Sequence, residues 1–270
     1  MSFDLMPVIW TAVSVLVLLL LQRWIHTHLH GLSLLITGRP QLAVVIYAIV
    51  LLPGVFLHEL SHWLTATLLG VRTGRFSIIP QRQPDGSIQL GYVEYYRGAT
   101  LGAFRESLIG GAPLIMGTAV ILLIGFRIFG ITELAVAIQS GQVDALTLAL
   151  GDVFRTPDFL VWLYLLFAVS NAMMPSRSDR RAWPAFFVTM LILIGLLYVL
   201  GILNVLMNDL VGPLTTVFGY LGLAFSMAIG VDLVFMGFIA LLEEIISRIK
   251  GVRVVYGSAE APPGTDNLTM

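Results

Sequence analysis

The chain has 270 residues, of which 57% are hydrophobic and only 11% are charged, against about 25% charged residues in an ordinary soluble domain. The formal net charge of −1 provides no basic surface for a nucleic acid, so we expect no nucleic-acid partner. Because the chain has no cysteine, it forms no disulfide, and any bound metal must use histidine and carboxylate ligands.

Apolar stretches of about 20 residues, the length that crosses a bilayer, predict about six transmembrane helices. They cover roughly residues 5–22, 42–70, 107–129, 159–175, 183–204 and 213–242. No basic residue precedes the first stretch, so we interpret it as a retained span and not as a cleaved leader. Residues 131–158 alternate apolar and polar side chains, which favours amphipathic helix at the membrane interface, with a buried re-entrant segment as the alternative.

Lysine and arginine indicate the orientation, because cytoplasmic segments carry an excess of both. With six spans and the N-terminus inside, eleven of the fifteen Lys and Arg residues fall on the inner side. We therefore expect a multi-pass integral protein of the plasma membrane, embedded in the lipid bilayer, with both termini cytoplasmic.

Residues 70–100 contain β-branched and aromatic side chains on either side of the turn signal Pro84-Asp85-Gly86, which predicts a β-hairpin. The last twelve residues are rich in proline and poor in apolar groups, which predicts disorder. The expected fold is thus an all-α polytopic membrane protein with a β-hairpin after the second span. We divide it into a first transmembrane helix with its connecting segment (1–41), a membrane core (42–258) and a disordered tail (259–270).

The second span contains the motif His58-Glu59-Leu60-Ser61-His62. On a helix, histidines four residues apart project from one face and can share one ion, and Glu59 lies beside it. Zinc lowers the pKa of a bound water to about 7, and a neighbouring carboxylate can accept its proton as a peptide carbonyl is attacked. Ionisable groups inside a membrane are costly, which favours a zinc site with Glu59 as general base over a hydrogen-bonded core cluster.

Two histidines require a third ligand at the same depth in the membrane. Asp179 meets this requirement, because it follows the fourth expected span by only a few residues. The alternative is a solvated loop carboxylate that pairs with one of the neighbouring arginines. Glu94 and Glu106 are weaker candidates for the third ligand.

From about Val55 to Asp179 these residues resemble the site-2 protease family of intramembrane zinc metalloproteases. The His58–His62 motif is similar to the family's His-Glu-x-x-His helix, with Ser61 where glycine is common. The segment 70–78 is similar to the hairpin that follows that helix, and residues 110–114 resemble the start of the next span.

The family's second motif is an Asn, then prolines, and an Asp eight positions after the Asn. Asn171 and Asp179 have this spacing, although Pro175 is one place late and two arginines replace the expected glycines. The resemblance implies that Asp179 is the third zinc ligand and that Asn171 is a hydrogen-bond donor to the substrate or the oxyanion. It also implies a compact form, because the short loops leave no room for an inserted peptide-binding domain.

We therefore expect a metalloendopeptidase that holds one zinc ion per chain and hydrolyses a peptide bond of a membrane protein or peptide substrate. The hairpin could present an edge strand to an unwound substrate helix. One rival is a catalytically inactive pseudoprotease that holds membrane proteins, and another is a metal or proton transporter. The intact Glu59 favours the enzyme, because a pure binding site needs no base, and the chain shows no inverted repeat.

Two other polar groups lie in apolar surroundings. Asp232, midway along the sixth expected span, is either a functional acid or a carboxyl bonded to Ser, Thr or Asn of another helix, and we favour the second. His26, His28 and His30 follow the first span, and we expect them to form an interfacial, partly protonated cluster far in depth from the metal site.

Overall fold

The computed structural model of the chain describes residues 4–82, 88–95, 102–201 and 203–256. Within these residues, four helices are long and apolar enough to cross a bilayer: α1 (Met6–Thr37), α2 (Pro40–Leu68), α3 (Ala103–Arg127) and α8 (Leu203–Lys250). A fifth crossing arises if α5 (Val143–Phe154) and α6 (Phe159–Ala172), which meet at 87°, form one broken span. The chain is therefore a helical membrane protein, and the predicted count of six spans is not confirmed.

The fourth and fifth predicted spans are shorter than expected. Helix α6 has 14 residues and α7 (Trp183–Val199) has 17, whereas about 20 are needed to cross a bilayer. The prediction extended the fourth span to residue 175, but the helix ends at Ala172 and Pro175 follows. It also merged α7 with the beginning of α8, although Gly201 lies between them with a φ of 72°.

The first helix is longer than its apolar stretch. It was predicted to end near residue 22, but α1 continues to Thr37 and ends at Gly38, which has a φ of 64°. Pro40 then begins α2, where its fixed φ suits the first helical turn. The histidines at positions 26, 28 and 30 therefore lie on a helix and not in a connecting segment.

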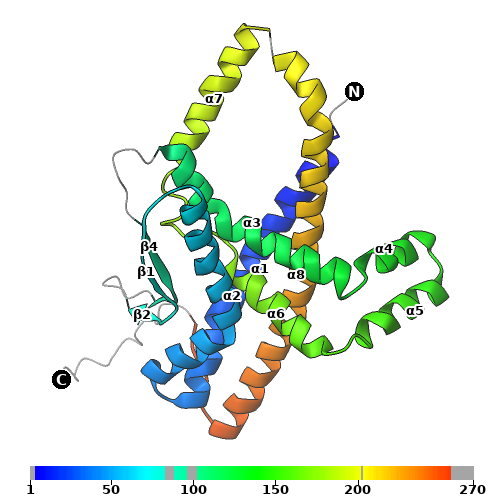
Figure 1. Ribbon diagram of the computed structural model, residues 1–270. Coiled ribbons are helices and arrows are strands. Elements are labelled where there is room, and N and C mark those ends of the chain that lie inside the picture. Colours follow the sequence, from blue (N-terminus) through cyan, green and yellow to red (C-terminus); the bar gives the residue numbers. More distant parts are fainter. Residues whose placement is uncertain (1–3, 83–87, 96–101, 202, 257–270) are drawn as a thin grey trace, which may run out of the picture.

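Helices α1 and α8 pack against each other and run in the same direction (Figure 1). Near the start of α1, the Nε1 of Trp10 donates to the Oγ of Ser226 over 3.0 Å. Near its end, the Nζ of Lys250 donates to the carbonyl of Leu35. If each helix crosses the bilayer once, this parallel packing places the chain ends before α1 and after α8 on opposite sides. The packing thus fits an odd number of crossings, and it does not support the expectation of two cytoplasmic termini.

Residues 131–158 form the helical pair α4 (Ile131–Ser140) and α5, which projects from the bundle (Figure 1). The predicted helical character of this segment is confirmed. Helix α5 has no buried residue.

The predicted hairpin is confirmed as a pair of short antiparallel ladders. Strand β1 (Thr73–Ser77) pairs with β4 (Tyr92–Tyr95), and β2 (Gln81–Arg82) pairs with β3 (Ile88–Gln89). The predicted turn at residues 84–86 and the predicted disordered tail at 259–270 lie outside the described residues.

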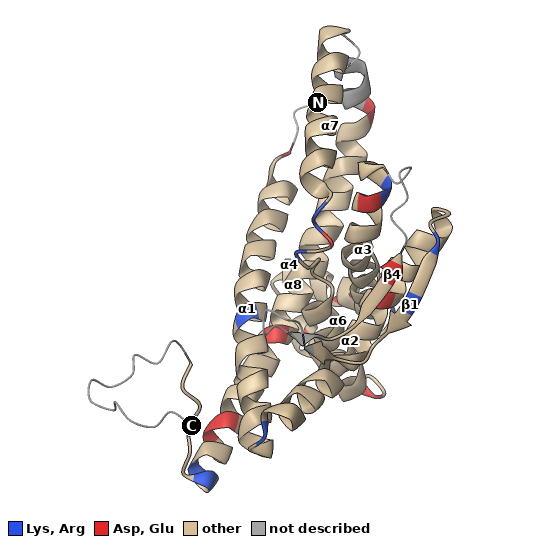
Figure 2. Ribbon diagram, turned by 90° about the vertical axis from the view of Figure 1, so that its left-hand side faces the viewer, with Lys and Arg blue, Asp and Glu red and all other residues tan. Residues whose placement is uncertain are grey.

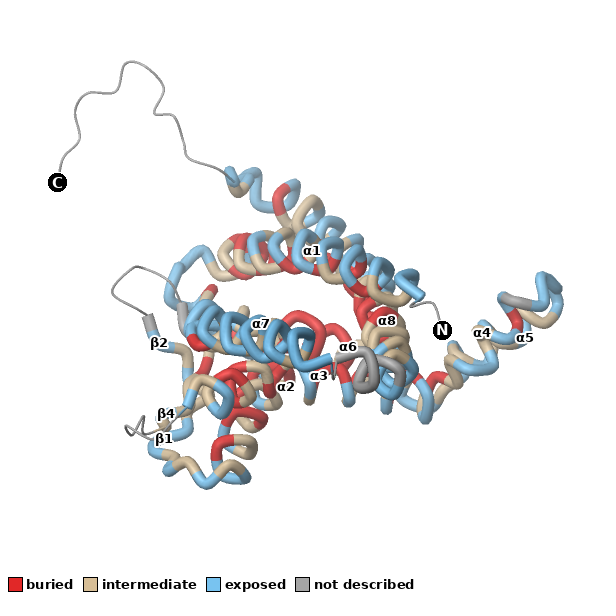
Figure 3. Tube along the Cα trace, turned by 90° about the horizontal axis from the view of Figure 1, so that it is seen from above, coloured by how far each residue is buried: buried red, intermediate tan, exposed pale blue. Residues whose placement is uncertain are grey.

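The buried residues lie mainly on α1, α2, α3, α6 and α8 (Figure 3). Charged residues are sparse along the shafts of these helices (Figure 2), and many large apolar residues of the helices are exposed. On α7, for example, Leu191 and Ile192 are each 68% exposed. Such a surface is expected of helices whose solvent is lipid.

Candidate metal centre

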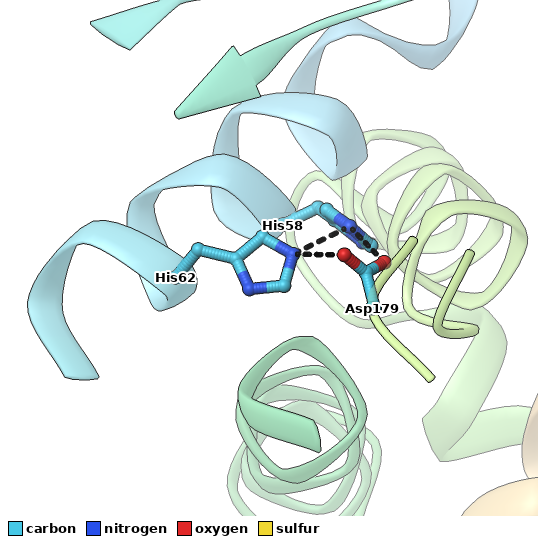
Figure 4. A group of neighbouring side chains, drawn as sticks. All are labelled: His58, His62 and Asp179. Atoms are coloured by element: carbon cyan, nitrogen blue, oxygen red, sulfur yellow. Dashed lines mark hydrogen bonds and ion pairs between the residues drawn. The ribbon is translucent and has the colours of Figure 1, made fainter. Parts of the chain in front are cut away.

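The structure brings His58, His62 and Asp179 together, as the sequence predicted (Figure 4). Both histidines project from α2, and Asp179 reaches them from the segment that joins α6 to α7. The two Nε2 atoms are 3.1 Å apart. Asp179 Oδ1 is 3.3 Å from the Nε2 of His62, and Oδ2 is 3.6 Å from the Nε2 of His58.

The second ring nitrogen of each histidine fixes its tautomer. The Nδ1 of His58 is 2.6 Å from the carbonyl oxygen of Ala172, and the Nδ1 of His62 is 2.8 Å from that of Ile109. A carbonyl oxygen only accepts, so each Nδ1 carries the hydrogen and donates it. Both Nε2 atoms of the neutral rings therefore direct a lone pair into the site, in the arrangement that orients histidine ligands in metal centres.

The spacing of these atoms fits a small cation. Ligands at about 2.0–2.1 Å from a tetrahedral zinc ion are about 3.3–3.4 Å from one another. The observed separations of 3.1, 3.3 and 3.6 Å are close to this value. Two imidazole lone pairs and a carboxylate that face one another repel unless a positive charge lies between them. Two histidines and one carboxylate are also the ligand set of catalytic zinc sites, which keep a fourth position open.

Asp179 is held by its own loop and by α3. The backbone N–H of Ser176 donates to its Oδ2 over 2.7 Å. A side chain at Gly110 of α3 would overlap the backbone carbonyl of Asp179, so this glycine permits the close approach. The hydrogen bond from Ser176 stabilises the ionised carboxylate, the form in which Asp179 can bind a metal.

Glu59 lies between the two histidines in sequence and is only 7% exposed. The hairpin covers it, since a Cβ at Gly91 would lie 2.8 Å from its Cγ and 3.1 Å from its Oε1. A proton acceptor thus adjoins the candidate ligands in the sequence, and the residue that precedes β4 packs against it. The two weaker candidates for third ligand, Glu94 and Glu106, are not part of the group of ligand atoms found among the described residues.

Asn171 does not direct its donors toward the metal ligands. Its Nδ2 donates to the carbonyl of Phe167 over 3.0 Å and to Oδ1 of Asp232 over 2.8 Å. The side chain therefore faces α8, and this geometry disagrees with the implied role of Asn171 as a donor to substrate. The prediction for Asp232 is confirmed, because its carboxyl accepts hydrogen bonds from Ser170 and Asn171 of another helix.

The expectation that the three histidines of α1 lie far from the site is wrong for His26. Its Nε2 is 3.1 Å from the carbonyl oxygen of Asn171. The carbonyl of the next residue, Ala172, accepts the hydrogen bond that orients His58. His28 pairs instead with Glu243 of α8 over 2.8 Å. Gln22 also approaches this turn, with its Nε2 bonded to the carbonyl of Ser170. Sequence reasoning overlooked Gln22, although a glutamine near the end of an apolar stretch is a signal of a buried partner.

Comparison with protein-family models, with curated proteins and with solved structures finds no match to this chain. Its function is therefore inferred from the residues of the site.

Proposed function

We propose that the protein is an intramembrane zinc metalloprotease, related to the site-2 proteases that its motifs resemble. The observation that carries the proposal is the tautomer of the two histidines. Each donates its Nδ1 hydrogen to a backbone carbonyl and directs Nε2 toward the other ligands. Together with Asp179 they form a zinc site with three protein ligands, and the motif adds a glutamate.

Zinc held by His58, His62 and Asp179 would supply a Lewis acid that activates water and polarises a peptide carbonyl. Glu59 is the general base that takes the proton from the attacking water and later delivers it to the leaving amine. Its near-complete burial keeps it away from bulk water, and the two histidine ligands lie one and three residues from it in the sequence.

The position of the site favours a membrane protein as substrate. The ligands on α2 belong to a helix that is long and apolar enough to span the bilayer. A peptide bond in a helix is shielded from attack, so the substrate must be extended at the site. The strands next to Glu59 provide an edge on which a substrate segment can be held in extended form.

The test is metal analysis combined with proteolysis, on the full chain reconstituted in lipid vesicles. Wild type and Glu59→Gln are compared for bound zinc and for cleavage of a labelled single-span membrane peptide with a helix-breaking centre. We expect equal zinc in both proteins and a rate lower by about 10²–10⁴-fold in Glu59→Gln, the usual contribution of a general base.

Other outcomes contradict the proposal in distinguishable ways. Wild type without zinc would exclude a zinc enzyme. Zinc with no cleavage in wild type, for this peptide and for single-span proteins of the native membrane, would favour the pseudoprotease. Zinc flux into vesicles that Glu59→Gln leaves unchanged would favour a transporter. Glu106→Gln is the matched control, since this acid lies on α3 outside the ligand group, and it should retain both zinc and cleavage.

A further inference from the structure

The last turn of α6 connects the metal ligand His58 to three other helices. The final carbonyls of a helix lack partners within it and must find them elsewhere. At the end of α6, consecutive carbonyls accept from side chains of neighbouring helices: that of Ser170 from Gln22, that of Asn171 from His26 and that of Ala172 from His58. The position of this turn therefore determines where His58 directs its Nε2.

The same turn is attached to α8 by Asp232. This side chain is fully buried, with 0% exposure, and Asn171 is 4% exposed. Asp232 Oδ1 is 2.8 Å from the Oγ of Ser170 and 2.8 Å from the Nδ2 of Asn171. The orientation of the amide is determined, because its other neighbour, the carbonyl of Phe167, can only accept a hydrogen bond.

Two oxygen atoms of this pair have no hydrogen-bond partner. They are Oδ2 of Asp232 and Oδ1 of Asn171, and both are inaccessible to solvent. In addition, the single hydroxyl hydrogen of Ser170 is within reach of both the Phe167 carbonyl and Asp232 Oδ1, and it can serve only one of them. The cluster thus has more acceptors than hydrogens, and each unpaired buried oxygen destabilises the folded protein.

An ionised Asp232 would be a buried charge without a partner. Among the described residues, no lysine, arginine or histidine forms an ion pair with it. A buried unpaired charge is more costly than a neutral carboxylic acid. One added hydrogen on Oδ2 removes the charge and supplies the cluster with a further donor.

We propose that Asp232 is a neutral carboxylic acid that forms a two-bond pair with Asn171, and that this pair positions the turn of α6 that orients His58. Asn171 Nδ2–H donates to Asp232 Oδ1, and Asp232 Oδ2–H donates to Asn171 Oδ1. Asp232 is then a positioning residue that acts on the metal site through the backbone of residues 171 and 172. The second half of the proposal rests on the proposed metal site, whereas the first half does not.

Infrared spectroscopy tests the protonation state directly, because a carboxylic acid and a carboxylate have separate stretching bands. At neutral pH, wild type should show a carboxylic-acid band that is absent from Asp232→Asn. Glu243→Gln is the control, since this acid lies at the far end of α8, and it should leave that band unchanged. If Asp232→Asn removes a carboxylate band instead, Asp232 is ionised and the proposal is wrong.

Zinc affinity tests the positioning role. Asp232→Ala should weaken zinc binding about tenfold, as the loss of groups that orient metal ligands does. Asp232→Asn should bind zinc as wild type does, because its amide can still donate to Asn171 Oδ1 and accept from Asn171 Nδ2. Wild-type affinity in Asp232→Ala, or an equal loss of zinc in Asp232→Asn, would overturn the positioning role. If Asp232→Ala fails to fold, Asp232→Leu, which keeps most of the side-chain volume, replaces it in the same comparison.

Both measurements are made without a substrate. If wild type binds zinc but cleaves nothing, the proposed protease function fails while the infrared and zinc results still hold. If wild type binds no zinc, the positioning role is excluded, and the infrared band alone decides whether Asp232 is neutral.

Discussion

Helices α3 and α7 are both strongly apolar, yet α3 lies at the centre of the bundle and α7 has no buried residue. The difference lies in their small and polar residues. Side chains at Gly110 and Gly117 of α3 would overlap Asp179 and Met173, whereas nothing lies within 4 Å of a Cβ built at Gly195 of α7. Since α3 touches its neighbours at these glycines, the backbone around the metal ligands can pack closely.

The comparison shows that apolar character alone does not determine where a helix lies in a membrane. Lipid is as apolar as a leucine side chain, so helices associate through close contacts of small residues and through hydrogen bonds. The metal site lies where both occur, between α2, α3 and the end of α6. Helix α7, which lacks such contacts, has an almost entirely exposed surface (Figure 3).

The largest expected effect comes from filling a close contact in the packed region. A Cβ at Gly54 of α2 would overlap the carbonyl oxygen of Ala168 in α6. Gly54→Leu should therefore destabilise the protein by more than about 3 kcal/mol, the upper end of the usual range for overpacking, because a backbone atom cannot move aside. Gly195→Leu on α7 is the matched control and should have no effect. Thermal unfolding in detergent measures both, and equal unfolding temperatures would contradict the comparison.

Removing a ligand should affect the metal site without disrupting the bundle. Asp179→Asn should weaken zinc binding more than about 100-fold. Removing a ligand reduces the affinity more than removing a group that only orients a ligand, which costs about 10- to 100-fold. Asp144→Asn makes the same chemical change on the exposed face of α5 and should leave zinc binding unchanged. Zinc titration of the two variants measures the difference. Wild-type affinity in Asp179→Asn would show that Asp179 is not a ligand.

A smaller effect is expected where the hairpin covers the base. In Gly91→Ala the new methyl group would lie 2.8 Å from the Cγ of Glu59, so either the Glu59 side chain or the backbone before β4 must shift. We expect cleavage to fall about tenfold while zinc content is unchanged, because positioning errors of about 1 Å can cost even more than this. Gly151→Ala on α5, where nothing lies within 4 Å of the added Cβ, should cleave at the wild-type rate. Loss of zinc in Gly91→Ala would mean that the hairpin supports the ligands themselves.

The smallest effect is expected at the C-terminal segment 251–256, which contacts α1 far from the site. The hydroxyl of Tyr256 donates to Glu243, so Tyr256→Phe should free this segment at a cost of about 0.5–1.5 kcal/mol. Burial raises the pKa of Tyr256 the most, and the hydrogen bond to Glu243 and the negative charge of Glu243 raise it further. Docking of the segment should thus be strongest below the ordinary tyrosine pKa and be lost as pH rises through the raised value.

Limited proteolysis of the 251–256 segment measures both effects. Faster cutting of Tyr256→Phe, with zinc content unchanged, is the expected result. Wild-type cutting at high pH that is no faster than at neutral pH would contradict the assigned role of the hydroxyl.

The sequence predicted the residues of the site more accurately than the helices around it. His58 and His62 were predicted from their spacing, because a helix fixes the relative position of residues four apart. Asp179 was predicted from its expected depth after the fourth span and from the resemblance to the family's second motif, and the structure brings it to both histidines. The length of α6 and the extension of α1 were missed. Beyond its apolar stretch, α1 carries His26, whose two ring nitrogens contact the hydroxyl of Tyr47 and the carbonyl of Asn171, and the local sequence does not indicate these partners.

The role of Asn171 was also mispredicted because it depends on a residue far away in the sequence. An asparagine eight residues before an aspartate indicates proximity to the site, but the direction of its side chain depends on Asp232, 61 residues further along the chain. No local pattern links these two positions. The sequence spacing thus predicted that the backbone near Asn171 approaches the candidate metal ligands. It did not predict the direction of the Asn171 side chain, which depends on a contact with another helix.

The pairing of α1 with α8 also affects how the protein is made. The first helix leaves the ribosome with Thr11 and Gln22 on a face that must enter lipid. The partners of these side chains, the carbonyls of Phe218 and Ser170, are synthesised much later. Until then, α1 must wait in the insertion machinery or in the membrane with unsatisfied polar groups. Asp179, the last candidate metal ligand along the chain, is made before Phe218 of α8, so all three candidate ligands exist before Thr11 has its partner.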